Sequence, residues 1–197
     1  MAHRVALKLG NALLARTIPV GCSEHHLAFG ATISLKPETL KLIVRDYVDS
    51  LIRDGFTRII FLPSHGGNFA PLAEAIEDAR KAHPQVAITG YTDLLGITGF
   101  LQRTAAELGI SEEACGAHAG DDETSLMMFL EPELVVRDRF APGYLGPLGE
   151  KEVQTIFERG MPALTENGVL GDPRQASAEK GEVYLEKLAS FLIEQVG

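Results

Sequence analysis

Two short apolar runs and the amphipathic segment between them constrain the fold more strongly than any other feature. The runs TRIIFLP (57–63) and QVAITGY (85–91) are each bounded by turn-forming residues, as buried parallel strands are. The segment between them, NFAPLAEAIEDARKAH (68–83), has helical apolar spacing, with Asn68 placed to cap its start. Strand, helix and strand in this order predict a βαβ unit, in which the two strands run parallel.

The rest of the chain continues this alternation. Helices are expected over 2–15, 37–55, 96–109, 149–160 and 177–196, with a further helix that stops near Pro132. Short strands are expected over 17–20 and 134–136. No repeat or linker divides the sequence. We therefore predict one α/β domain over residues 1–197, built on a mostly parallel sheet with helices on both faces.

Composition excludes several classes of function. The net charge is −9 and the 18 basic residues are scattered, which argues against binding to nucleic acid or an anionic membrane. No apolar run approaches the roughly 20 residues that a membrane span needs. Cys22 and Cys115 lie far apart and form no disulfide framework, so we expect reduced thiols and a cytoplasmic protein.

Three polar loops carry four of the six histidines. The loops are GCSEHHLAFG (21–30), SHGGN (64–68) and CGAHAGDDETS (115–125), and the histidines are His25, His26, His65 and His118. Each loop follows a predicted strand or enters a predicted helix. Because ligands of open α/β sheets bind at the carboxyl ends of strands, we expect the loops to converge on one pocket.

His65 is open to three interpretations. At the end of a strand, its imidazole suits a metal ligand or a base, and the glycines that follow permit a close backbone approach. Alternatively, SHGGN is a tight turn with a solvent-exposed histidine. A phosphate cradle is a third interpretation, although the loop is shorter than a P-loop and lacks its lysine.

The other two loops also allow a structural interpretation. Asp121, Asp122 and Glu123 favour the dipole of a helix N-terminus, but Glu123 and His118 also suit a metal-linked acid/base site. His25 and His26 belong to a loop that can equally be a polar surface segment. Side chains of adjacent residues usually diverge, so we expect at most one of this pair to face a common centre.

Four motifs in order resemble the creatininase (creatinine amidohydrolase-like) family over nearly the whole chain. They are GCSEHHLAFGATISL, GFTRIIFLPSHGGN, HAGDDETSLMMFLEP and GDPRQASAEKGEVYLEKLASFL. The resemblance implies an α/β sandwich, usually a homo-oligomer, that hydrolyses amide or related C–N bonds at a two-metal site of zinc, manganese or iron. Known branches act on creatinine, on a formamidopyrimidine nucleotide, and on a peptide in mycofactocin maturation.

The resemblance also implies roles for individual residues. His65 and Glu123 match metal ligands, His118 matches a histidine that shuttles protons at the substrate, and His26 matches a histidine near the substrate. A divalent metal lowers the pKa of bound water and polarises a carbonyl, and a histidine passes a proton to the leaving nitrogen. The implied function is a metal-dependent amidohydrolase for a small-molecule substrate with a cyclic amide, formamide or other non-peptide C–N bond.

One family motif, Glu-x-His-Gly followed by Thr-Asp, is missing from this sequence, and it normally supplies most of the metal ligands. His65 and Glu123 fall short of the three protein ligands that a catalytic zinc site usually has. We therefore expect an N-terminal strand and loop to be missing. In one explanation, Met1 is an internal methionine of a longer reading frame, whose full-length product holds two metals per site. In another, the chain is a natural short form with a rebuilt metal site. The rebuilt site would draw on nearby donors: Glu24, His25, Asp121 or Asp122. The remaining alternative is a metal-free relative that serves as a small-molecule-binding or assembly subunit.

Overall fold

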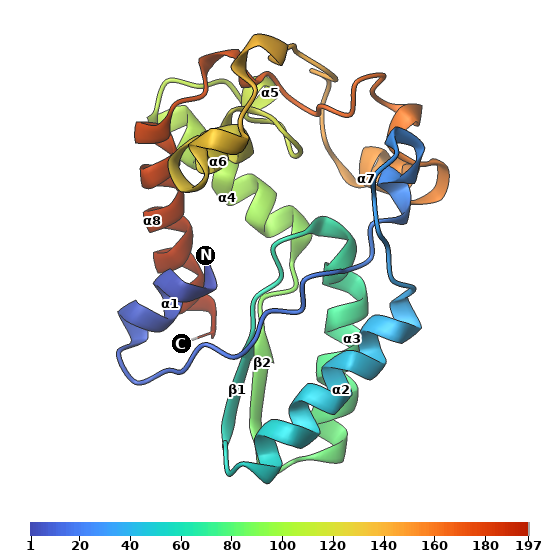
Figure 1. Ribbon diagram of the computed structural model, residues 1–197, viewed down its shortest axis with the longest axis vertical. Helices are drawn as coiled ribbons and strands as arrows, with labels where there is room; N and C mark the ends of the chain where they lie inside the picture. The colour runs from blue at the N-terminus through green and yellow to red at the C-terminus, as the bar shows by residue number, and fades with distance from the viewer. Residues whose placement is uncertain (197) are drawn as a thin grey trace.

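The computed structural model describes residues 1–196 and has the predicted α/β fold (Figure 1). Strands β1 (Arg58–Phe61) and β2 (Ala87–Gly90) pair in parallel, in a register that runs from Arg58 opposite Ala87 to Phe61 opposite Gly90. Helix α3 (Phe69–Ala82) connects them. The predicted βαβ unit is therefore confirmed, and it carries His65 on the segment that leaves β1.

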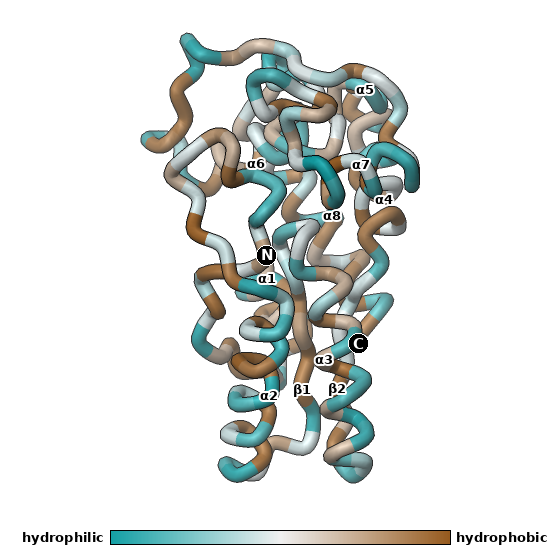
Figure 2. Tube along the Cα trace, turned by 90° about the vertical axis from the view of Figure 1, so that its right-hand side faces the viewer, coloured by the Kyte–Doolittle hydropathy of each residue, from teal (hydrophilic) through white to brown (hydrophobic). Residues whose placement is uncertain are grey.

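Helix α2 (Pro37–Arg53) and α3 cover one face of this sheet. Their buried side chains recur every three or four residues, so each helix presents one apolar stripe to the strands. Ile59 and Ile88 are opposite each other in the two strands, and both are buried in the same core cluster. Figure 2 shows the largely apolar β1 beside α2 and α3. This core fixes the end of β1 from which the site loop starts.

The remaining α-helices build the other part of the molecule. They are α1 (Ala2–Leu9), α4 (Leu94–Glu107), α5 (Glu112–Cys115), α6 (Asp121–Leu130), α7 (Glu150–Arg159) and α8 (Ala178–Val196). The core of α1 and α8 reaches the segments just beyond the strands through Leu62 and Tyr91. Figure 1 shows α1 and α8 on one side of the sheet and α2 and α3 on the other, as predicted.

Short 3₁₀ helices occupy many of the connections. They are η1 (Glu24–Phe29), η2 (Gly66–Asn68), η3 (Pro132–Leu134), η4 (Arg137–Arg139), η5 (Met161–Ala163) and η6 (Pro173–Gln175). Two of them, η1 and η2, lie in the histidine loops. Within residues 1–196, none of the helices is both long and apolar enough to cross a membrane.

Two predicted strands are wrong. Residues 17–20 are irregular, and residues 134–136 lie at the end of η3 and the turn that leads to η4. Their β-branched residues favour an extended backbone, but a strand also needs a partner, because propensity alone is weak. In the described part of the chain, β1 and β2 form the whole sheet, so the sheet is smaller than predicted.

The end of one helix and the start of another also differ from the predictions. Helix α1 stops at Leu9 rather than near residue 15, because Gly10 adopts the left-handed conformation (φ 73°) and its N–H bonds to Ala6 O. Asn68 does not cap α3. Its backbone is already helical, since the glycines before it form η2, and its Oδ1 accepts a hydrogen bond from the Cys22 N–H at 2.8 Å.

A close crossing of α6 and α8 positions the third histidine loop. Asp121, which is fully buried, accepts hydrogen bonds from Lys180 Nζ at 2.8 Å and from Tyr184 Oη at 3.1 Å. Beside this pair, a Cβ added at Gly181 would overlap the carbonyl oxygen of Ser125. A buried carboxylate that lost its partners would be costly, so this contact fixes the start of α6 against α8.

Replacing Gly181 by alanine should destabilise the protein, although alanine in a helix is ordinarily favoured over glycine by about 0.5–1 kcal/mol. The reason is the overlap with Ser125, since overpacking typically costs about 1–3 kcal/mol. Gly99→Ala in α4 is the matched control, because there an added Cβ meets only the end of Arg103, at 3.4 Å. Denaturant unfolding should show opposite shifts for the two variants, and a gain of stability in both would contradict the tight crossing.

Ile88→Ala should lower the free energy of unfolding by about 2–5 kcal/mol, because it removes buried methyl groups from the centre of the core and leaves a cavity. Ile88 is 1% exposed, whereas Ile33 is 75% exposed. Ile33→Ala is therefore the control, with an expected change within about 0.5 kcal/mol. Equal losses for the two variants in urea unfolding would show that the core does not lie where the structure has it.

Candidate functional site

The three histidine loops converge beyond the end of β1, as predicted. The ring centroid of His26 lies 5.3 Å from that of His65 and 4.6 Å from that of His118. His26 comes from η1, His65 from the turn after β1, and His118 from the loop before α6. Segments far apart in the sequence therefore bring their imidazoles to one place.

His25 also belongs to this cluster, contrary to the expectation that only one of the adjacent pair would face it. The possible ligand atoms of His25, His26 and His65 all lie within 4.8 Å of one another. The reason is the close packing of the two loops: a Cβ on Gly67 would overlap Cys22 O and lie 2.9 Å from the His25 ring. At such short range, both adjacent side chains reach the same centre. The glycine doublet after His65 was the signal in the sequence for this approach.

Hydrogen bonds to the first loop fix the ring of His65. Its Nε2 lies 3.1 Å from Cys22 O and 3.2 Å from Ser23 Oγ, while Asn68 accepts from the Cys22 N–H. A carbonyl oxygen only accepts, so the bond to Cys22 places the proton of His65 on Nε2 and leaves the lone pair on Nδ1. Sequence reasoning missed Asn68 as a tie between the loops, because it favoured a cap.

The three clustered imidazoles are neutral at physiological pH. Burial, followed by the charges of the neighbouring imidazoles, lowers the pKa of His25 to about 4. Burial, with His118 and His65 next, lowers the pKa of His26 to about 4 as well. Burial also lowers the pKa of His65, against the opposing effect of its bond to Cys22. Each ring therefore keeps a lone pair, which metal ligation requires.

His118 and Glu123 form a second unit beside the cluster. Nδ1 of His118 lies 3.4 Å from Glu123 Oε2, and the same oxygen accepts a hydrogen bond from the Ala119 N–H at 2.7 Å. The backbone of His118 is held by a bridge to Leu170. Desolvation raises the pKa of Glu123, but the hydrogen bonds from His118 and Ala119 outweigh it, and the net pKa is lowered. Glu123 is therefore a carboxylate that orients His118.

Two other acids considered as metal ligands are unsuited to that role. Asp121 is bonded to Lys180 and Tyr184 of α8, and Asp122 is buried. Asp122 is 1% exposed, and desolvation raises its pKa well above the ordinary value for an aspartic acid. A carboxyl that holds its proton is a poor ligand for a cation. Glu24 is exposed at the start of η1 and lies outside the group of ligand atoms, so the imidazoles are the main donors among the described residues.

A cavity of about 440 Å³ opens onto this site. Its lining includes the rings of His26, His65 and His118, with Phe29 and the loop Asn167–Val169 opposite. Lysine and arginine are absent from the described residues that line it. The cavity therefore combines imidazoles with an uncharged wall, a lining suited to a neutral ligand better than to a phosphate.

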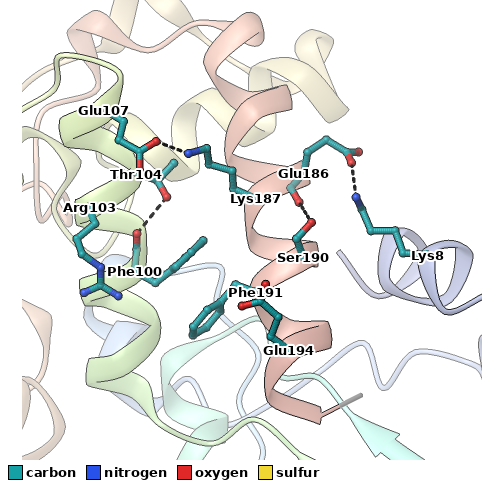
Figure 3. Close-up of a pocket in the computed structure, with 10 residues that line it drawn as sticks. All are labelled: Lys8, Phe100, Arg103, Thr104, Glu107, Glu186, Lys187, Ser190, Phe191 and Glu194. Atoms are coloured by element: carbon teal, nitrogen blue, oxygen red, sulfur yellow. Dashed lines mark hydrogen bonds and ion pairs between the residues drawn. The ribbon is translucent and has the colours of Figure 1, made fainter.

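A second cavity, of about 420 Å³, lies between α4 and α8 (Figure 3). Four of its charged side chains pair with one another: Lys187 with Glu107, and Lys8 with Glu186 at 3.2 Å. Phe191, which stacks on Phe100 with ring centroids 4.3 Å apart, forms its apolar floor. Imidazoles and thiols are absent from its described lining, so this groove is a contact between helices rather than the candidate site.

Comparison with known proteins identifies the family. The Creatininase family model, described as creatinine amidohydrolase, matches residues 1–196. A mycofactocin precursor peptide peptidase of Mycobacterium ulcerans (strain Agy99) is 30% identical over 93% of this chain and 65% of its own length. A creatinine amidohydrolase of Pseudomonas putida is 32% identical over 94% of this chain and 74% of its own. The chain thus spans less than two thirds of the mycobacterial relative.

Solved structures agree with this assignment. A manganese creatininase superposes with a TM-score of 0.74 at 27% identity, covering 99% of this chain and 78% of its own. A mutant creatininase of the Zn–Zn type superposes with a TM-score of 0.71 at 25% identity, covering 98% and 77%. The family match and the superposed structures agree, and the chain belongs to the Creatininase family.

Proposed function

We propose that this chain is a metal-dependent amidohydrolase that cleaves a cyclic amide, a formamide or another non-peptide C–N bond. One observation carries the proposal: three neutral imidazoles lie within ligand distance of one another, and two of them share a cavity with a histidine that is paired with a carboxylate. Holding a cation and moving a proton are the two tasks that hydrolysis of an amide requires.

The donors of the chain fit a divalent metal. His65 keeps a lone pair on Nδ1 while Nε2 binds Cys22 O, the second hydrogen bond that metal-binding histidines commonly make. The relatives described as Zn–Zn and manganese creatininases support zinc or manganese as the metal. When bound, such a metal supplies Lewis acidity and lowers the pKa of water. Glu123 as a ligand stays a prediction.

His118 is the residue we assign to proton transfer. Because its Nδ1 is directed to Glu123, its Nε2 is the nitrogen that can exchange a proton with a leaving nitrogen in the cavity. Glu123 keeps the ring in this orientation. His26 lies on the same wall, within contact of His118, where the sequence predicts a residue near the substrate.

The cavity favours a small, uncharged substrate. Its volume of about 440 Å³ is in the usual range for small-molecule sites, and its described lining offers no basic side chain to a phosphate. The relatives include a creatinine amidohydrolase and a peptide peptidase, so creatinine and a mycofactocin precursor peptide are the first compounds to test. A homo-oligomer and a cytoplasmic location stay predictions.

His65→Ala should abolish both metal binding and turnover, because His65 supplies a nitrogen donor from the rigid turn after β1. The check is elemental mass spectrometry of the purified chain together with an assay of amide hydrolysis. His3→Ala is the control, since His3 is an exposed residue of α1. Metal and turnover that persist in His65→Ala would overturn the proposal, and a metal-free, inactive parent would favour a non-catalytic binding or assembly subunit.

His118→Ala should lower kcat by roughly 10²–10⁴-fold while the metal content stays at the level of the parent, because His118 moves protons and lies outside the three-histidine group. Glu123→Gln should lower kcat less, since it weakens the orientation of the ring without removing it. Loss of the metal in His118→Ala would contradict this division of roles.

A further inference from the structure

We infer that His25 is a metal ligand, so that His25, His26 and His65 form a three-imidazole site within this chain. The inference rests on the proposed metal-dependent function and extends it by naming the ligand set: His25 is selected from the donors considered for a rebuilt site, and His26 was expected near the substrate. His26 then binds the metal instead of the substrate, and the site reaches the three protein ligands that a catalytic zinc usually has.

The spacing of the three rings supports this assignment. Two imidazoles that bind one tetrahedral zinc at ~2.0–2.1 Å place their ring centroids roughly 5 Å apart. The His25–His65 and His26–His65 centroids are both 5.3 Å apart. The His25–His26 pair is closer, at 4.3 Å, so small rotations of these two rings complete the arrangement.

The surroundings of His25 hold it in position for such a role. Phe157 of α7 contacts the His25 ring edge-on, with centroids 4.9 Å apart, and His65 lies parallel to it on another side, at an interplanar angle of 2°. Gly67 leaves room for the ring, since a Cβ there would lie 2.9 Å from its Cε1. These contacts restrict the ring to orientations near the cluster, from which a small turn brings its nitrogen lone pair toward the shared centre.

The donor set also selects among metals. Three imidazole nitrogens suit zinc or cobalt, whereas manganese and magnesium prefer carboxylate, carbonyl and water oxygens. The carboxylate of Glu123 is paired with His118. The chain should therefore bind zinc and cobalt more tightly than manganese. Three protein ligands leave the fourth position of a tetrahedral site open toward the cavity, which His26 and His65 line.

The test is titration of the chelator-treated chain with Zn²⁺, Co²⁺ and Mn²⁺ alone, followed by calorimetry and by the visible absorption of tetrahedral Co²⁺. His25→Ala, His26→Ala and His65→Ala should each weaken Zn²⁺ binding by more than the ~10–100-fold that loss of an outer hydrogen-bond partner costs, and should abolish the tetrahedral Co²⁺ spectrum. His118→Ala and His3→Ala should keep parental affinity and spectrum.

The outcomes distinguish a failure of the His25 assignment from a failure of the proposed metal-dependent function. Parental Zn²⁺ affinity in His25→Ala, with loss in His65→Ala, would overturn the His25 assignment and leave the metal-dependent function intact. A parent that binds none of the three metals would overturn both. His25→Gln, which keeps the size of the side chain, repeats the test, and circular dichroism of the metal-free variants shows whether each is folded.

Discussion

The contact between the first histidine loop and the turn after β1 is the interaction on which the site depends. Cys22 donates its N–H to Asn68 and its carbonyl oxygen accepts a hydrogen bond from His65, so the backbone of one residue of the first loop is tied to two residues of the turn. Only glycine at position 67 permits the two backbones to approach this closely. This explains the residue pattern of the SHGGN segment. Strand β1 leads into His65, and the glycines after it allow the first loop, with His25 and His26, to pack against this turn.

A buried charge contact has the same role for the third loop. Asp121 is fully buried and bound by Lys180 and Tyr184, which fixes the first turn of α6 on α8. Two residues later, Glu123 reaches back to the Ala119 N–H and to His118. Asp121 therefore anchors the helix, whereas Glu123 orients a histidine. Their order in the sequence could not reveal this division, because it depends on which side of α6 faces α8.

Much of the fold could be predicted from local pattern, and the failures share one physical cause. The βαβ unit followed from two apolar runs, and α2 from Pro37 at its start and apolar spacing along it. Residues 17–20 also contain β-branched residues, yet pairing is a tertiary property, and no partner strand lies beside them in the described chain. The convergence of the three loops was expected from strand ends, but only the His65 loop follows a strand in the structure, and tertiary packing brings the other two beside it. The inclusion of His25 could not be predicted, because it depends on the distance between two backbones.

The electrostatics of the cluster explain how neighbouring imidazoles can have different roles. Metal ligands must be neutral, and burial among other imidazoles keeps His25, His26 and His65 so. A proton shuttle must instead hold a proton at intervals, which requires a nearby negative charge. Glu123 pairs with His118, which lies outside the group of His25, His26 and His65. The described lining of the cavity adds no other charged side chain. In the proposed function, the position of this one carboxylate separates the three rings assigned to the metal from the fourth assigned to proton transfer.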